Sequence, residues 1–388
     1  MPNNRIFYAC QAVAIGNDGI TDIVENTDGD TYINQNSSSK FNFVKGLQSV
    51  GINTTFNLEQ AFEIGQISIY ENIEEVPDVE VTLEKVLDGF PLLFHMGTPS
   101  GSNNTLVGRS TGKVGIRLGV YGDGVTSAQD TSSENPVTEV YCSGMFLSNV
   151  SYTIPVDGNC TESVTFVGND KRWYGAAIVG SLGNGSVLAL GGSNYADDTP
   201  QNLLHPSGGI QRRENVDFAR SQMPTSLAGI SSAGSGNNLS NNFPIAHVQS
   251  IAISTDLGRE PMQELGRKGP YHRFATFPIE VTCDIECYSI SGDAVQAFEE
   301  GDPANAGTVN EGNNTPEERI SVRLDDGTDF DLGGKNRLSS VSYGGGDAGG
   351  GNVTVTYSYT NFNDLSIRHR FDPNMVGYNA GYIGGLPD

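Results

Sequence analysis

Two stretches of this sequence, Gln48–Gly65 (QSVGINTTFNLEQAFEIG) and Gln249–Gly266 (QSIAISTDLGREPMQELG), are versions of one another. Aligned without gaps at an offset of 201 residues (249 − 48), they agree at seven positions, which in the first stretch are Gln48, Ser49, Ile52, Thr54, Glu59, Glu63 and Gly65. Unrelated sequences of ordinary composition would agree at about one position over this length. The agreement indicates that the chain carries one structural unit twice.

Weaker similarities follow both stretches in the same order. Val79–Thr82 (VEVT) resembles Ile279–Thr282 (IEVT). Two further pairs share an offset of 191 (338 − 147 and 354 − 163): LSNVSY at 147–152 with LSSVSY at 338–343, and SVT at 163–165 with TVT at 354–356. We therefore predict two related domains in tandem, at residues 1–174 and 210–367, with 175–209 as a linker or interface insertion and 368–388 as a C-terminal arm.

The composition favours a mainly β fold. Forty-nine glycines and a charged fraction of 18% are typical of a turn-rich β protein, and no long helical periodicity is present. We expect one helix per domain, packed on a β framework, at Phe90–Met96 in the first and Ala294–Glu300 in the second. Short helical turns are predicted at Leu58–Ile64 and Arg259–Leu265, each ended by a glycine.

The net charge and the cysteines limit the possible partners and the cellular compartment. A formal charge of −24 argues against phosphate-backbone binding, which depends on Lys and Arg. No run of about 18 apolar residues is present to span a bilayer, and the first residues lack a signal-peptide pattern. The five cysteines are scattered, and Cys283 and Cys287 would lie about 13 Å apart on one strand. We expect reduced, buried thiols and folding in a cytosol.

No chemical motif identifies a catalytic, cofactor or metal site. The five histidines are dispersed, no pair has the HxxxH spacing, and no GxSxG elbow occurs. The acidic residues are so numerous that no glycosidase pair is singled out. The expectation is a protein that is not an enzyme, with no catalytic residues, cofactor or metal; an enzyme acting on polysaccharide is the least favoured alternative.

The connecting segments after the two repeated stretches differ in charge. The segment 66–76 contains Glu71, Glu74 and Glu75, whereas the segment 267–277 contains Arg267, Lys268, His272 and Arg273. We predict that these residues mediate contacts between subunits or rings, with the acidic group near a basic group of an adjacent domain. The alternative is that both segments are solvated loops, in which case an exposed ion pair would contribute about 1 kcal/mol or less.

The repeated segments resemble those of the major tail tube proteins of tailed bacteriophages. The resemblance rests on QSVGINTTFNLEQAFEIG with VEVTLEKVLDG, on QSIAISTDLGREPMQELG with FPIEVTCDIE, and on the closing hairpins LSNVSYTIPVDGNCTESVTF and LSSVSYGGGDAGGGNVTVTY. It covers about 250 of the 388 residues and leaves 175–242 and the last twenty or so unexplained.

The resemblance implies a structural virion protein located in the tail and assembled in the host cytoplasm. It implies that each domain is a β-barrel or sandwich with a flanking helix, and that trimeric rings with pseudo-sixfold symmetry stack into a tube through which DNA passes without specific binding. The implied partners are further copies of the chain, the tape measure protein and tail terminator or tip proteins, with no membrane. The runner-up function is a β-sandwich tail-tip or fibre module that binds host glycans.

Overall fold

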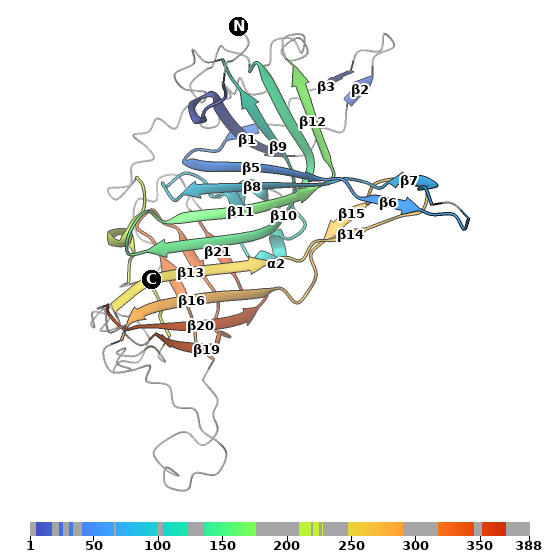
Figure 1. The fold of residues 1–388 in the computed structure, drawn as a ribbon. Helices are drawn as coiled ribbons and strands as arrows, with labels where there is room; N and C mark the ends of the chain where they lie inside the picture. Colours follow the sequence, from blue (N-terminus) through green and yellow to red (C-terminus); the bar gives the residue numbers. More distant parts are fainter. Residues whose placement is uncertain are drawn as a thin grey trace.

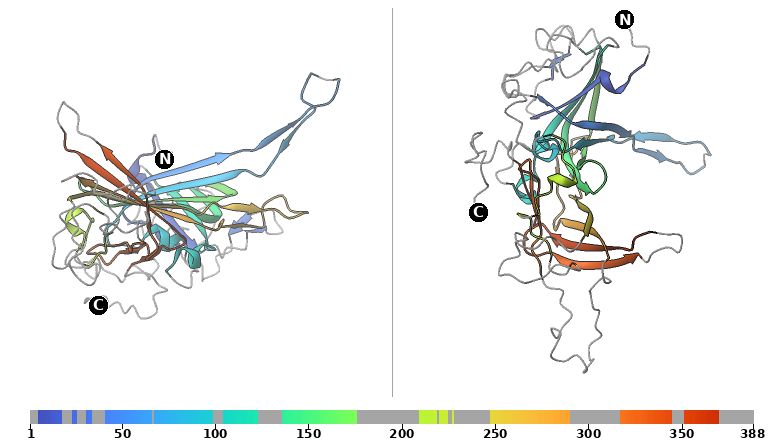
Figure 2. Two further views of the ribbon diagram at one scale, coloured as in Figure 1. Left: turned by 90° about the horizontal axis from the view of Figure 1, so that it is seen from below. Right: turned by 90° about the vertical axis from the view of Figure 1, so that its left-hand side faces the viewer.

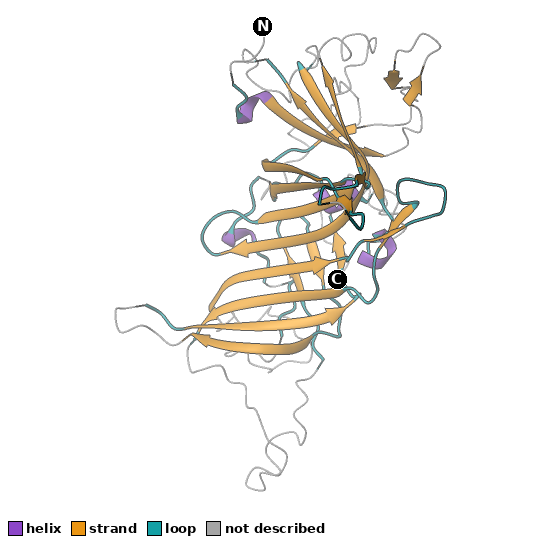
Figure 3. Cartoon of the chain, turned by 45° about the vertical axis from the view of Figure 1, so that its right-hand side comes forward, coloured by secondary structure: helices purple, strands orange, loops and turns teal. Residues whose placement is uncertain are grey.

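The computed structural model is built almost entirely from antiparallel β-strands (Figures 1 and 3). It describes residues 5–17, 23–25, 31–33, 41–65, 67–98, 104–122, 136–175, 209–218, 220–224, 227, 247–289, 317–344 and 351–369. The mainly β fold expected from the composition is confirmed.

A long sheet of eight strands dominates the molecule (Figure 1). Every neighbouring pair along it is antiparallel. In spatial order the strands are β5 (Leu47–Thr55), β8 (Asp78–Val86), β11 (Thr161–Gly168), β10 (Thr138–Pro155), β13 (His247–Asp256), β16 (Glu280–Tyr288), β20 (Thr354–Phe362) and β19 (Arg337–Gly344).

Strand β10 has 18 residues, about twice the length of its neighbours, and the 12-stranded sheet branches at it into the long sheet and a second sheet. Its second half, from Phe146 onward, pairs with β11 and β13, while its first half pairs with β9 and β12. The register with β9 shifts between Cys142 and Met145, and Gly144 between them has φ 63°, a value that favours glycine. The second sheet also contains β12 (Asp170–Gly175), β9 (Lys113–Val120), β1 (Gln11–Asn17) and β4 (Phe41–Phe43).

The remaining elements are short. A three-stranded sheet is formed by β17 (Ser321–Arg323), β18 (Asp329–Asp331) and β21 (Ser366–Arg368). Three hairpins are β2–β3 (Ile23–Glu25, Thr31–Ile33), β6–β7 (Leu58–Ala61, Glu71–Glu74) and β14–β15 (Glu260–Met262, His272–Phe274). The described helices are η1 (Tyr8–Cys10), α1 (Leu93–Gly97), α2 (Leu106–Arg109) and η2 (Arg213–Asn215).

One face of the long sheet carries the hydrophobic core. Apolar side chains alternate with polar ones along each strand, as in β16, where Val281, Cys283 and Ile285 are buried. The small sheet packs on this face, with the Tyr152 and Phe330 rings 4.5 Å apart between centroids. Helix α1 is attached to the same face through the buried Glu162 carboxylate, which accepts hydrogen bonds from the backbone of Leu93 and Phe94 and from the Tyr152 hydroxyl.

The two halves of the long sheet match strand for strand. The first four-strand unit has the order β5-β8-β11-β10, and the second has β13-β16-β20-β19. A β-bulge at Gln48 in the first unit recurs at Gln249 in the second, and a bulge at Ser148 recurs at Ser339. Because bulges are specific local features, their recurrence fixes which residues of the two units are equivalent.

This equivalence departs from the sequence similarities in two strands. The pairing makes Val81 equivalent to Cys283, an offset of 202 (283 − 81) where the VEVT and IEVT segments gave 200. It makes Phe166 equivalent to Tyr359, an offset of 193 (359 − 166) where the sequence gave 191. In both strands the sequence similarity misplaces the equivalent residue by two positions. A shift of two keeps every side chain on the same face, so hydrophobic alternation does not reveal it.

The predicted helical turns at 58–64 and 259–265 are wrong. Leu58 and Glu260 begin strands, because the segments fold back on Glu71–Glu74 and His272–Phe274 and complete their backbone hydrogen bonds across a hairpin. Gly65 and Gly266 lie in the turns with φ 101° and 87°, where a side chain would be strained. The two hairpins extend beyond the end of the long sheet (Figures 1 and 2). We call β6–β7 the first arm (56–75) and β14–β15 the second arm (257–277).

Helix α1 begins within the predicted Phe90–Met96 segment and ends one residue beyond it, whereas Ala294–Glu300 lies outside the described residues. The predicted linker and C-terminal arm lie almost wholly outside them too. The segment after the linker joins the first unit to the small three-stranded sheet. Gln211 bonds Leu87 and Cys160 of the first unit through its backbone, and Gln222 pairs with Ser321 of the small sheet.

Candidate functional site

The face of the long sheet opposite the core, here called the open face, is lined by small polar side chains. In the first unit these include Ser49, Asn53, Thr82 and Ser163, all exposed or partly exposed. The second unit repeats the composition, with Ser254, Thr282, Thr356, Ser358 and Ser342.

The strand register connects these residues into one row across all eight strands. The row joins directly paired positions from one edge of the sheet to the other: Ser49, Glu84, Ser163, Ser151, Ser254, Thr282, Thr360 and Arg337. All eight side chains are polar, and six of them are Ser or Thr. Directly paired residues share a face, so this row forms a continuous hydrophilic track.

Carboxylates project from the same face on three strands: Glu80 and Glu84 of β8, Asp256 of β13, and Glu280, Asp284 and Glu286 of β16. Glu84 and Glu286 are equivalent in the two units. Each accepts a hydrogen bond from a serine hydroxyl of the neighbouring strand, Ser49 at 3.3 Å and Ser250 at 3.2 Å. In the described part of these eight strands, Arg337 at the β19 edge is the only Lys or Arg on the open face.

This surface is suited to repelling a polyanion rather than holding it. Hydroxyl groups are small and well hydrated, and the carboxylates give the face a negative potential. Phosphate recognition in proteins depends on Arg, Lys or convergent backbone N–H groups. Lys and Arg side chains are scarce on the open face, and the backbone N–H groups of its strands are already used in the hydrogen bonds of the sheet.

The sequence-predicted site residues lie on the two arms and do not form one cluster. Glu71 and Glu74 are on β7 and Glu75 follows it, all with exposed side chains. Arg267 and Lys268 are exposed at the turn of the second arm, where Arg267 lies 3.8 Å from Glu264. Among the ion pairs of the described residues, none joins the acidic group to the basic group.

Two of the predicted basic residues instead attach the second arm to the first unit. The Arg273 guanidinium is 9% exposed and donates to Asp78 Oδ1 at 2.6 Å and to Asn169 Oδ1 at 3.2 Å. The His272 ring stacks on Phe274 and lies 4.9 Å from the Phe146 ring.

Arg259, which sequence reasoning did not single out, adds to this attachment. It donates to the Leu147 carbonyl at 2.5 Å, and burial lowers the pKa of its guanidinium to about 10. Nothing in the sequence around Arg259 indicated this role.

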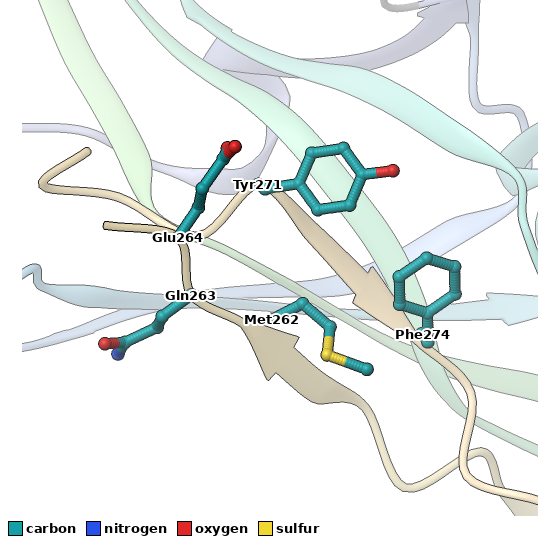
Figure 4. Close-up of a pocket in the computed structure, with 5 residues that line it drawn as sticks. All are labelled: Met262, Gln263, Glu264, Tyr271 and Phe274. Atoms are coloured by element: carbon teal, nitrogen blue, oxygen red, sulfur yellow. The ribbon is translucent and has the colours of Figure 1, made fainter. Parts of the chain in front are cut away.

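A hollow of about 340 Å³ lies on the second arm, lined by Met262, Gln263, Glu264, Tyr271 and Phe274. Figure 4 shows Met262, Tyr271 and Phe274 on one side of the hairpin and the Gln263 amide directed away. Tyr271 and Met262 are about half exposed. The hollow offers aromatic and thioether contact surface with a carboxylate at its rim.

The first arm exposes apolar side chains that the charge-based prediction missed. Phe56, Phe62, Ile64 and Ile67 are between 68% and fully exposed. Large exposed apolar side chains gathered on one hairpin point to an interaction site. The signal was present in the sequence as the run of Phe and Ile between Phe56 and Ile69.

The five cysteines are buried and free, as predicted, and burial raises the pKa of the Cys142 and Cys283 thiols to about 12. In the described part of the chain, no group of three or more His, Cys, Asp and Glu side chains is arranged to hold a metal ion. None of the described helices has the length and hydropathy needed to cross a bilayer.

Comparison with known proteins gives weak structural similarities. No protein-family model matches the chain, and no curated protein does. Solved structures similar to it include the tube-terminating cap of the anti-feeding prophage (12% identity, 45% of this chain, 95% of the other) and its baseplate (13%, 45% and 98%). A third is the sheath-tube complex, in the extended state, of an extracellular contractile injection system (13%, 45% and 93%). The TM-score is 0.29 in each case, too low to carry an inference.

Proposed function

We propose that this chain is a non-enzymatic structural subunit of a phage-like tail, which polymerises into rings stacked as a tube for the passage of DNA. The observation that carries the proposal is the open face, a hydroxyl-lined and acidic surface that crosses eight strands without a break. A conduit for DNA needs a wall that is wetted but does not bind phosphate, and this face has both properties.

The matching four-strand units support the polymeric part of the proposal. We interpret them as products of a domain duplication, with domains at 1–174 and 210–367. A chain with two equivalent units occupies two adjoining places in a ring, so three copies give pseudo-sixfold symmetry. Linking two units covalently raises their effective concentration for one another. In the proposed virion the rings would contact tape measure, terminator and tip proteins.

Electron microscopy of the purified full-length protein tests the proposal directly. The expected result is annular particles or stacked tubes at raised protein concentration. Uniform monomers at every concentration and salt would refute it.

The open face has its own test, which does not depend on the tube's dimensions. In the double variant Glu84→Lys with Glu286→Lys, two equivalent carboxylates become ammonium groups, and each place in the ring gains a phosphate contact. Assembled wild-type protein should not retain duplex DNA in filter binding at low salt, whereas the variant should retain it and release it as salt rises. Equal retention by both proteins would show that the face does not meet DNA.

A glycan-binding tail-tip module is the second candidate. The hollow beside Tyr271 and Phe274 favours it, because sugar rings pack on aromatic side chains and carboxylates accept their hydroxyl hydrogens. Glycan-array binding that is lost in Tyr271→Ala, by particles that remain discrete in the microscope, would favour this function over the tube.

A further inference from the structure

The edge strands of the long sheet, β5 and β19, resemble the two strands that pair at its centre, β13 and β10. We infer that β19 of one chain pairs antiparallel with β5 of a second copy, in the register that β10 adopts with β13 inside the chain. This inference rests on the proposed assembly and specifies its interface. β10 and β19 are equivalent strands, as are β5 and β13, so the internal β10–β13 junction is a template for the external one.

The exposed residues at the free edges correspond to buried residues at the junction. Tyr343 of β19 is 51% exposed, while its equivalent Tyr152 is 1% exposed against β13. Phe56, which follows β5, is 71% exposed, while its equivalent Leu257 is fully buried. The edges therefore carry large apolar side chains at the positions that the junction covers.

Backbone chemistry leads to the same conclusion. β5 and β19 each pair with one neighbour only in the described structure, so each presents a row of N–H and C=O groups to solvent. Natural edge strands are protected by proline, inward-pointing charge or a covering segment. Neither Leu47–Thr55 nor Arg337–Gly344 contains a proline or lysine, and the only charge is Arg337 at one end. Such edges are suited to pairing with another copy.

The template predicts the register residue by residue. Inside the chain, Ser151 pairs with Ser254 and Tyr152 with Ile253. Subtracting 201 from β13 and adding 191 to β10 places Ser342 opposite Asn53 of the next copy, both on the open face. The remaining predicted pairs are Ser340–Thr55, Val341–Thr54, Tyr343–Ile52 and Gly344–Gly51.

Cysteine cross-linking of the full-length chain tests this register. The double variant Ser342→Cys with Asn53→Cys should form disulfides between chains, because directly paired strand residues lie within disulfide reach. Mild oxidation should convert the monomer band on a non-reducing denaturing gel into a ladder that ends in a closed species. The five native cysteines are buried, so they add little background.

Two matched variants act as controls. Ser151→Cys with Ser254→Cys places the same pair at the internal junction and should give an intrachain disulfide with no ladder. Ser342→Cys with Ser49→Cys keeps the face but lies four residues out of register, about 13 Å along the strand, and should not cross-link.

The outcomes separate the two proposals. If annular particles form but the in-register pair does not cross-link, or the out-of-register pair does, the pairing is wrong and the assembly stands. If the protein stays monomeric by microscopy and gives no ladder while the internal control forms its disulfide, both proposals fail.

Discussion

The basic side chains of the second arm contribute unequally to the stability of the fold, although they were predicted to act as one group. Arg273 is nearly buried and bonds Asp78 and Asn169, whereas Arg267 is more than half exposed at 3.8 Å from Glu264. Buried charge-assisted hydrogen bonds stabilise more than exposed pairs, which contribute little. The two arginines therefore form a natural matched pair for mutation.

We predict that Arg273→Met lowers the free energy of unfolding by about 1–2 kcal/mol, because Asp78 and Asn169 lose a charged donor. Arg267→Met should leave the urea midpoint nearly unchanged. Urea denaturation of both variants at a concentration where the protein is monomeric measures the difference. Indistinguishable midpoints for the two variants would contradict the assignment of Arg273 as the anchor of the arm.

A buried ion pair in the second sheet should make stability depend on pH. Glu139 lies 3.4 Å from Arg117, and burial raises the pKa of its carboxyl to about 7 although Arg117 lowers it. Between the unfolded value of about 4.3 and 7, the folded state then binds more protons than the unfolded state, so stability falls as pH rises.

The variant Glu139→Gln should lack this dependence. Across that window the wild type should lose roughly 2–4 kcal/mol relative to the variant, whatever the offset between the two proteins at low pH. Urea midpoints at about pH 4.5 and pH 7.5 for both proteins measure it. Parallel pH profiles would mean that Arg117 keeps Glu139 ionised in the folded state throughout.

At the scale of elements, the first arm is the segment most clearly suited to a contact outside the chain. Its acidic residues are exposed, and its apolar side chains have the chemistry of an interface centre surrounded by charge. The second arm is attached to the first unit by Arg259 and Arg273. Their equivalents on the first arm, at an offset of 201, are Leu58 and Asn72, which carry no charge.

We predict that Glu74→Lys with Glu75→Lys impairs polymerisation without lowering monomer stability. The defect should be largest at low salt, because exposed charges are screened within about 10 Å at 0.1 M. Turbidity and microscopy measure assembly, and the neutral variant Glu74→Gln with Glu75→Gln should give an intermediate defect. Normal assembly of the reversed variant at both low and physiological salt would mean that the arm is solvated and makes no such contact.

The elements also show what the sequence could and could not predict. Apolar and polar residues alternate along β8, β11, β13 and β16, because one face of each strand is buried and the other is not, so the sequence itself marks these strands. The first strand of each arm was misread as a helical turn because its side chains are almost all exposed, which leaves no periodicity to read.

The open face was missed for a related reason. Ser and Thr residues in strands look like ordinary solvent-facing positions, as do Ser163 and Thr282 when each is taken alone. Only the register of eight strands, set by pairs of residues up to about a hundred positions apart, brings them into one row. The bulges at Gln48 and Ser148 set that register, and neither a glutamine nor a serine predicts a bulge from sequence.

At the scale of the whole molecule, the register predicts the geometry of a closed ring. The open-face row enters at Ser49 on β5 and reaches Ser254 on β13 four strands later. The equivalent of Ser254 in the first unit is Asn53 (254 − 201), so each unit shifts the row by four residues over four strands. For a strand rise of about 3.3 Å and a spacing of about 4.8 Å, this stagger gives strands tilted by about 35° in a closed barrel.

That tilt fixes the diameter once the number of copies is chosen. Three copies supply 24 strands (3 × 8), which close at about 45 Å between backbones, whereas two copies would give about 30 Å and four about 60 Å. Because the open face carries mostly Ser, Thr and Asn, side chains narrow the three-copy lumen only to about 40 Å, enough for a hydrated DNA duplex. Electron cryomicroscopy of tubes in cross-section measures this opening. A lumen near 40 Å with strands tilted by about 35° would support three copies in the proposed register. Strands parallel to the tube axis would refute the β5–β19 pairing, because they require a ring without stagger.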